Sequence, residues 1–440
     1  MLVVHAADLH IDSPLRGLGR IEGAPTQDIR LATRRAFVHL IDFCLERAAT
    51  LLILAGDVFD GEWRDFNTGL FFVRQLARLR DVGARVVMIH GNHDAESALA
   101  QHIPLPEHVR LLSAEAPETL EYADLGLAVH GQSYYSRVVA DNLAEAYPPP
   151  RRGLLNVGVL HTNAVGASEH KNYAPCTVAQ LVAHGYDYWA LGHVHKRSVL
   201  HERPWVVYPG NLQGRHVRET GPKGCTAITI EHGRISAVDH RNMDVLRWAE
   251  LELTLGPKPV RFAQGQGSAA EADDDAARDT LEVLLERIRR GLAAHARDAN
   301  GRPVIVRITI SGATRLHARL AANPAPIAAR IRAVAADLGD VWPEKIRFNT
   351  RPLGSDAPDG ELLALHRALR DEFARLAADD DALKAHLETL TPLSAGVAPY
   401  LDRRPDSAER VRAQLAEIEA RLLGALSLRA DVDGELEPRA

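Results

Sequence analysis

Short apolar runs and helical stretches alternate along the first half of the chain. Runs rich in β-branched residues predict strands at 2–6, 51–57 and 85–94, and apolar residues spaced three or four positions apart predict helices at 28–49 and 66–80. Strands that alternate with helices of this length indicate βαβ units and a buried, largely parallel sheet.

Further short strands follow at closer spacing, which predicts a second, more antiparallel sheet packed on the first. These strands are expected at 119–122, 126–130, 155–160, 187–191, 205–208 and 225–231. Residues 225–242 form an expected hairpin with His232 and Gly233 at its turn.

The hydrophobic pattern changes near residue 245 and again near residue 350. The elements expected between these points are helices at 280–297 and 324–337 and strands at 303–312 and 341–350, which together make a compact α+β domain. After residue 350, leucines recur at helical spacing in amphipathic helices whose outer faces are acidic. We therefore expect three parts, at 1–245, 246–350 and 351–440.

Composition and charge narrow the class of protein. A chain of 440 residues exceeds the size of one hydrophobic core, and 46% hydrophobic with 25% charged residues excludes a largely disordered or fibrous protein. The N-terminus lacks the pattern of a signal peptide, no apolar run is long enough for a membrane span, and three distant cysteines fit a reducing cytoplasm. The net charge of −6 resides in residues 351–440, which hold 12 basic and 18 acidic residues. Because the rest is neutral, any contact with DNA must come from a local groove or from bound metal.

Five polar motifs each follow an apolar run. They are AADLH (6–10), AGDVFD (55–60), HGNHD (90–94), VLHTN (159–163) and LGHVH (191–195). In open α/β sheets, ligands bind beyond the carboxyl ends of the strands, so these motifs are expected to converge. Each motif alone is a weak signal, because a lone D-x-H is usually a surface turn and a lone H-x-H is usually structural. Five such motifs at successive strand ends indicate a site.

The side chains in these motifs are carboxylates and imidazoles without thiolates, which suits Mn, Fe, Zn or a similar divalent ion. They are too many for one metal and enough for two, with a carboxylate such as Asp57 between them. Two such ions can bind the attacking and leaving oxygens of a phosphoester and activate water. The candidates are Asp8, His10, Asp57, Asn92, His93, Asp94, His161, His193 and His195.

The ordered series D-x-H, GD-x-x-D, GNHD, H and GH-x-H resembles the calcineurin-like metallophosphoesterase superfamily. The motifs AADLH and AGDVFD, with YPGNLQGRHVRE at 208–219, are similar to its DNA-repair exonuclease branch, which includes SbcD-like and YhaO-type proteins. The resemblance implies an α/β fold, a four-layer β-sandwich flanked by helices. A small α+β capping domain and C-terminal helices that dock a partner ATPase would follow it.

The resemblance also implies a role for each position. It assigns the first metal ion to Asp8, His10, Asp57 and His195, and the second to Asp57, Asn92, His161 and His193. His93 would be the general acid or transition-state stabiliser, and Asp94 would orient it. Two Mn ions are expected, with Fe, Zn or Mg as alternatives.

Substrate contacts are less sharply indicated. Asp60 stands where some relatives carry a second phosphate-contacting histidine, and an ionised carboxylate cannot donate a proton, so a supporting role fits it better. His170, Lys171, Arg215 and His216 could meet substrate phosphate or DNA, although a solvated loop explains them equally well.

The function expected from these features is two-metal hydrolysis of DNA phosphodiesters. It would be an exonuclease activity in DNA repair, working in the cytoplasm with an SbcC-like or YhaN-like ATPase. Hydrolysis of nucleotides or other small phosphoesters is the first alternative. A structural subunit of an ATPase complex is the second, and the intact ligand set disfavours it. A homodimer is left open, and no membrane association is expected.

Overall fold

The computed structural model describes residues 1–13, 15, 31–60, 67–96, 103–164, 174–256, 280–352, 360–381, 411–412, 415–416, 418–419 and 422. These residues form two compact units, one of 1–249 with 295–306 and the other of 250–294 with 307–440. The three-part division expected from the sequence stays a prediction. Among the described residues, no helix is both long and apolar enough to cross a membrane.

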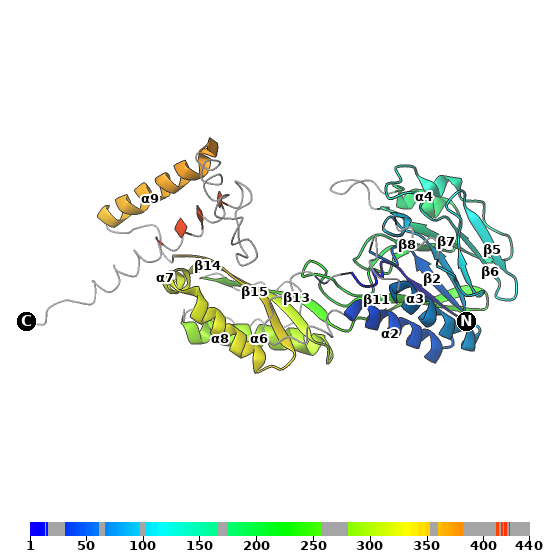
Figure 1. Ribbon diagram of the computed structural model, residues 1–440, viewed down its shortest axis with the longest axis horizontal. Helices are drawn as coiled ribbons and strands as arrows, with labels where there is room; N and C mark the ends of the chain where they lie inside the picture. The colour runs from blue at the N-terminus through cyan, green and yellow to red at the C-terminus, as the bar shows by residue number, and fades with distance from the viewer. Residues whose placement is uncertain are drawn as a thin grey trace, which may run out of the picture. The chain divides into compact units, whose positions relative to one another are not determined.

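The first sheet carries the predicted βαβ pattern. Its strand order is β12-β11-β1-β2-β3-β4, and β1 to β4 run parallel while β11 pairs antiparallel with β1 and β12. The strands are β1 (Leu2–Ala6), β2 (Leu51–Ala55), β3 (Arg85–Ile89), β4 (Val109–Leu111), β11 (Gly224–Glu231) and β12 (Arg234–Asn242). Helices α2 (Ala32–Glu46) and α3 (Asn67–Ala77) cover its outer face (Figure 1).

The second sheet has the order β5-β6-β7-β8-β10-β9. Its strands are β5 (Glu118–Tyr122), β6 (Leu127–Gly131), β7 (Leu155–His161), β8 (Tyr188–Gly192), β9 (Ser198–Glu202) and β10 (Trp205–Tyr208). The expectation that this sheet is more antiparallel than the first is wrong, because β6, β7, β8 and β10 are parallel and only the two edge pairs are antiparallel, as many as in the first sheet. The strand at 225–231 was also misplaced, since β11 belongs to the first sheet. Close spacing along the chain did not reveal which strands are neighbours.

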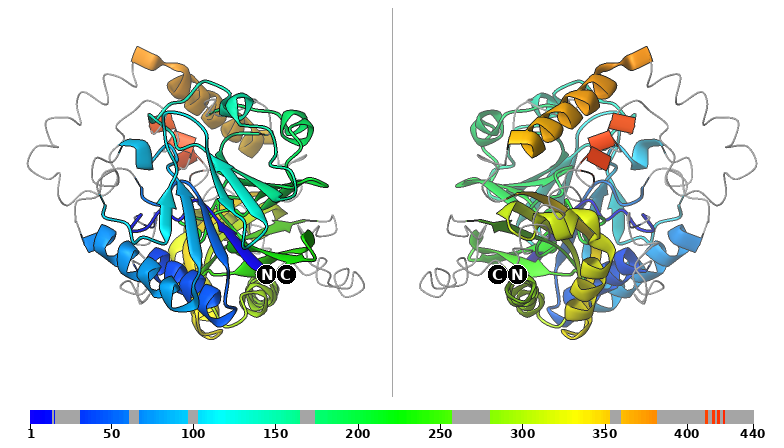
Figure 2. Two further views of the ribbon diagram at one scale, coloured as in Figure 1. Left: turned by 90° about the vertical axis from the view of Figure 1, so that its right-hand side faces the viewer. Right: turned by 90° about the vertical axis from the view of Figure 1, so that its left-hand side faces the viewer.

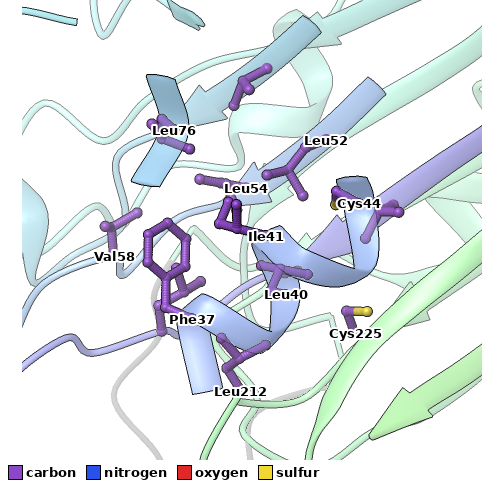
Figure 3. Close-up of a cluster of buried hydrophobic side chains, with 14 of the residues drawn as sticks. Phe37, Leu40, Ile41, Cys44, Leu52, Leu54, Val58, Leu76, Leu212 and Cys225 are labelled. Atoms are coloured by element: carbon purple, nitrogen blue, oxygen red, sulfur yellow. The ribbon is translucent and has the colours of Figure 1, made fainter. Parts of the chain in front are cut away.

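The two sheets pack face to face between helical layers, as the predicted four-layer sandwich requires (Figure 2). Side chains from both sheets, including Ile53, Val87 and Val159, are fully buried in one cluster. On the outer side of the first sheet, Phe37, Leu40 and other α2 residues pack on Leu52 and Leu54 (Figure 3). On the outer side of the second sheet lies α4 (Val178–Ala183). This packing places the carboxyl ends of β1, β2, β3, β7 and β8 at one edge of the two sheets.

The residues after 246 form a separate three-stranded sheet of order β13-β14-β15 with helices on one face (Figure 1). Its elements are β13 (Arg247–Leu255), α6 (Leu281–Asp298), β14 (Val304–Thr314), α7 (His317–Ala322), α8 (Pro324–Ala336) and β15 (Val341–Pro352). The predicted helices and strands of this region match α6, β14, α8 and β15 closely. Helix α9 (Gly360–Ala378) follows.

Candidate active site

The expected ligands converge at the carboxyl edge of the two packed sheets. Asp8 and His10 follow β1, Asp57 follows β2, Asn92 follows β3, His161 ends β7, and His193 and His195 follow β8. The structure thus brings together residues that lie up to 187 positions apart in the sequence. All except His193 and His195 are buried.

One group of ligand atoms comes from Asp8, His10 and His195, whose ligand atoms lie within 4.8 Å of one another. Nε2 of His195 is 3.1 Å from Nε2 of His10 and 3.8 Å from Oδ1 of Asp8. Two imidazole nitrogens and a carboxylate oxygen that face one another form a donor set suited to a divalent cation.

A second group comes from Asp57, His161 and His193, also within 4.8 Å. Asn92 joins it, because its Oδ1 is 3.1 Å from Nε2 of His161. Oδ2 of Asp57 lies between the two groups, 3.4 Å from Nε2 of His161 and 3.9 Å from Nε2 of His10. Asp57 is therefore placed to bridge them.

The backbone around the ligands is strained. Asp8, His10, Asp57 and His193 have φ values of 52°, 44°, 52° and 103°, which residues other than glycine rarely adopt. Such conformations cost about 1–3 kcal/mol each and persist where the surrounding structure holds them. At Gly192 a Cβ atom would collide with the carbonyl oxygen of Ala55, so the close approach of β8 to β2 requires glycine there.

The ligand set fits a bound cation. Nδ1 of His161 is 2.9 Å from the carbonyl oxygen of Ala55 and donates to it, so Nε2 faces the oxygens of Asn92 and Asp57. Burial lowers the pKa of His161, but the Asp57 carboxylate outweighs burial and raises the pKa to about 9. A positive charge is thus favoured at this point.

The neighbouring imidazoles are kept neutral. Burial lowers the pKa of His10 to about 4 and that of His193 to about 3, so both keep a lone pair for a metal. Burial raises the pKa of Asp57, but the charge of His161 and the hydrogen bond to it hold this pKa well below its usual range. Neutral imidazoles beside an ionised carboxylate are the protonation states that metal binding needs.

His93 lies at the rim of the ligand cluster. Its backbone N–H donates to Oδ1 of Asp57 at 2.9 Å, and its ring is 34% exposed, so it can reach a substrate. Nδ1 of His93 is 3.2 Å from Oδ1 of Asp60, and this contact raises the pKa of His93. The Asp60 carboxylate therefore favours the protonated form of His93.

Asp94 differs from the expectation that it orients His93. Its buried carboxylate accepts hydrogen bonds from the backbone N–H groups of Val58, Phe59 and Gly91 at 2.9–3.1 Å. The carboxylate beside Nδ1 of His93 belongs instead to Asp60. Asp94 thus ties together the loops that carry Asp57 and Asn92.

Comparison with known proteins shows which family the chain resembles. Residues 1–197 match the model of the calcineurin-like phosphoesterase family, and residues 273–351 match that of the middle domain of metallophosphoesterase YhaO. The protein named Uncharacterized metallophosphoesterase YhaO, from Bacillus subtilis (strain 168), is 38% identical over 321 residues, which cover 67% of this chain and 78% of that one. The chain belongs to the YhaO family of metallophosphoesterases. The resemblance and the fold class expected from the motifs are therefore confirmed, and the protein is a metal-dependent phosphoesterase.

More distant relatives include a subunit of a nuclease and a DNA repair protein. A relative from Escherichia coli (strain K12), named as one subunit of nuclease SbcCD, is 24% identical over 288 residues, covering 56% of this chain and 69% of that one. DNA double-strand break repair protein Mre11 from Methanopyrus kandleri is 24% identical over 231 residues, covering 48% of each chain.

The possible substrate contacts fall into two sets. Arg215 of this YhaO-family chain lies against the site, with Nη1 3.3 Å from Oγ of Ser13 and 3.6 Å from Oδ1 of Asp60. His216 is 34% exposed beside it, with Nε2 3.6 Å from Oε1 of Glu219. His170 and Lys171 lie outside the described residues.

Sequence reasoning missed Glu219, whose Oε1 is 2.6 Å from Nδ1 of His195. Burial raises the pKa of Glu219, but the hydrogen bond from His195 and the contacts with Arg215 outweigh burial and hold this pKa well below its usual range. The only signal was its place at the end of the motif YPGNLQGRHVRE (208–219), which gave no indication of its partner.

Proposed function

We propose that this YhaO-family protein is a two-metal-dependent DNA phosphodiesterase, acting as an exonuclease in DNA repair. The observation that carries the proposal is the position of Oδ2 of Asp57 between two sets of ligand atoms, 3.4 Å from His161 and 3.9 Å from His10. Asp8, His10, Asp57 and His195 would hold one divalent ion, and Asp57, Asn92, His161 and His193 the other. Mn is the ion that we favour.

When bound, such ions supply positive charge to the phosphate oxygens and lower the pKa of water. The chain itself supplies the acid. Asp60 holds Nδ1 of His93, which leaves the Nε2 proton of His93 free for the oxygen that leaves phosphorus when the P–O bond breaks. A positioned acid of this kind typically contributes ~10²–10⁴ in rate.

Arg215 supports a phosphate-binding face beside His93. Its guanidinium lies close to Ser13 and to Asp60, and Asp60 also contacts His10 and His93. Since arginine presents several N–H groups in a planar fork, it can bind a phosphate oxygen while it keeps these contacts. The relatives named as part of a nuclease and as a DNA double-strand break repair protein favour DNA over a small ester.

The test compares three substrates with and without added Mn. Linear duplex DNA, a single-stranded oligonucleotide and bis-p-nitrophenyl phosphate are each incubated with the wild-type protein and with Arg215→Gln. We expect Mn-dependent loss of nucleotides from DNA ends, and a larger effect of Arg215→Gln on DNA than on the small ester. Hydrolysis of the small ester alone, with DNA left intact, would instead support a small-phosphoester hydrolase.

We also propose that the C-terminal helices dock an ATPase. Arg412 binds the carbonyl oxygen of Ala377 at 2.9 Å and forms an ion pair with Asp380, which joins the end of α9 to the last helical positions. Ile418 and Leu422, one helical turn apart, remain 48% and 45% exposed. Exposed apolar side chains at helical spacing on an acidic segment suit a partner groove with a basic rim.

Full-length protein carrying Ile418→Glu and Leu422→Glu tests this second proposal. We expect it to keep its activity on bis-p-nitrophenyl phosphate but to lose co-purification with the co-expressed ATPase, whereas Ala416→Glu on the same segment keeps both. Unchanged co-purification by the double variant would exclude this surface as the docking site.

A further inference from the structure

The segment that follows β10 contacts His195 and Asp60 at the edge of the candidate ligand group. It contains the motif YPGNLQGRHVRE (208–219), whose last residue, Glu219, is only 7% exposed. Neither catalysis nor ligand binding accounts for a buried carboxylate at this place. Its contacts show which group it serves.

Glu219 determines the tautomer of His195. Oε1 of Glu219 is 2.6 Å from Nδ1 of His195, and an ionised carboxylate can only accept, so Nδ1 of His195 carries the proton. Nη2 of Arg215 lies 3.4 Å from the same nitrogen and could only donate to it, but this contact is much longer than the 2.6 Å contact with Glu219, which therefore decides the tautomer. Nε2 of His195 is then left with its lone pair, directed towards His10 and Asp8.

The carboxylate is held independently of His195. Oε2 of Glu219 accepts from Nδ2 of Asn211 at 2.9 Å and from the backbone N–H of Arg215 at 2.7 Å. The same segment also binds the backbone of His195, because the carbonyl oxygen of His195 accepts a hydrogen bond from Nζ of Lys223 at 2.9 Å. Other contacts thus hold the Glu219 carboxylate in place, so the carboxylate can orient the His195 imidazole.

We propose that Glu219 is a positioning residue that fixes His195 as an Nε2 ligand of a divalent ion and ties the loop carrying Arg215 to that ion. A carboxylate that accepts from the far nitrogen of a metal-binding histidine orients the ring and strengthens it as a ligand. The proposal rests on the two-metal site of the proposed function, but it does not depend on DNA as the substrate.

The carboxylate chemistry makes Glu219→Gln a sharp test. An amide has a single acceptor oxygen, whereas Glu219 uses one oxygen for His195 and the other for two N–H donors. Whichever way the amide turns, an N–H group faces another donor. Glu231→Gln is the matched control, because it makes the same chemical change at an exposed position at the end of β11.

Titration calorimetry with Mn²⁺ alone, on metal-free full-length protein, measures each ion separately. In Glu219→Gln we expect the affinity for one of the two ions to fall ~10–100-fold, with the other ion much less affected and Glu231→Gln equal to the wild type. Glu219→Asp, which keeps two acceptor oxygens, should recover part of the loss. Wild-type affinity for both ions in Glu219→Gln would overturn the proposal.

A second measurement reads the wild-type protein and does not need Glu219→Gln, in case that variant does not fold. In ¹⁵N-histidine NMR spectra of the metal-free protein, the His195 signals, assigned through His195→Asn, should show a proton on Nδ1. A proton on Nε2 instead would contradict the proposal. If the wild type bound two Mn²⁺ ions and left DNA intact, the proposed nuclease function would fail while the role of Glu219 stood.

Discussion

Replacing Asp94 by asparagine separates two roles for this carboxylate. Oδ2 of Asp94 accepts from the backbone N–H groups of Val58 at 3.1 Å and Gly91 at 3.0 Å, and Oδ1 accepts from that of Phe59 at 2.9 Å. The amide of asparagine keeps one acceptor oxygen. If this oxygen takes the place of Oδ2, the N–H of Phe59 faces an NH₂ group and loses its partner.

The magnitude follows from one lost partner at a fully buried position. An unsatisfied buried donor costs ~1–3 kcal/mol, so we expect the free energy of unfolding of the metallophosphoesterase domain to fall by about 2 kcal/mol. For a domain of this size, such a loss lowers Tm by roughly 4–8 °C. Because the two loops carry Asp57 and Asn92, Mn²⁺ affinity should fall as well.

Thermal unfolding of the metal-free protein and turnover at saturating Mn²⁺ distinguish the two roles. We expect Asp94→Asn to unfold earlier yet, once loaded with metal, to turn over bis-p-nitrophenyl phosphate within a few-fold of the wild-type rate. Asp239→Asn, at an exposed position of β12, should change neither quantity appreciably. Unchanged Tm with a large loss of turnover would refute this reasoning and restore the expectation that Asp94 acts through His93.

Three further predictions concern the acid, the glycine and a buried histidine. His93→Gln should retain both metal ions, measured by elemental analysis, and lose ~10²–10⁴ in turnover of an ester with a poor leaving group. Asp57→Ala should lose metal and activity together. Near-normal turnover by His93→Gln would exclude His93 as the acid. Gly192→Ala should destabilise the protein by about 1–3 kcal/mol in urea unfolding and weaken Mn²⁺ binding, because the added Cβ displaces the Ala55 carbonyl group that fixes His161. An unchanged Mn²⁺ affinity would show that the contact between Ala55 and His161 does not affect metal binding. Burial lowers the pKa of His5 to about 3, so the unfolded state binds a proton more readily and acid favours unfolding. Between pH 7 and pH 5, the free energy of unfolding of the metal-free wild type should therefore fall by about 2 kcal/mol more than that of His5→Gln. An equal pH dependence of the two proteins would disprove this prediction.

The convergence of the candidate ligands could be predicted because it depends on where each strand ends. Each motif follows a buried parallel strand, and parallel strands of stacked sheets end at one edge, so the convergence of Asp57 and His161 needed no knowledge of distant contacts. The α+β elements after residue 280 were equally visible, since α6 and β14 carry plain helical and strand periodicity.

Side-chain partners could not be predicted in the same way. Asp94 adjoins His93 in the sequence, yet its carboxylate binds the backbone of the neighbouring loop, because Asp60 occupies the position beside Nδ1 of His93. Glu219 meets His195 across 24 positions that include β9 and β10, and it lies in the loop between β10 and β11, so no periodicity reports this contact. The pairing of β11 with β1 is also a long-range choice that spacing along the chain does not encode.

Anomalous diffraction from a crystal of the wild-type protein loaded with Mn²⁺ tests the two-metal site most directly. We predict two Mn peaks, one among Asp8, His10 and His195 and the other among Asn92, His161 and His193, with Asp57 in contact with both. A single peak at saturating Mn²⁺, or peaks away from Asp57, would contradict the account.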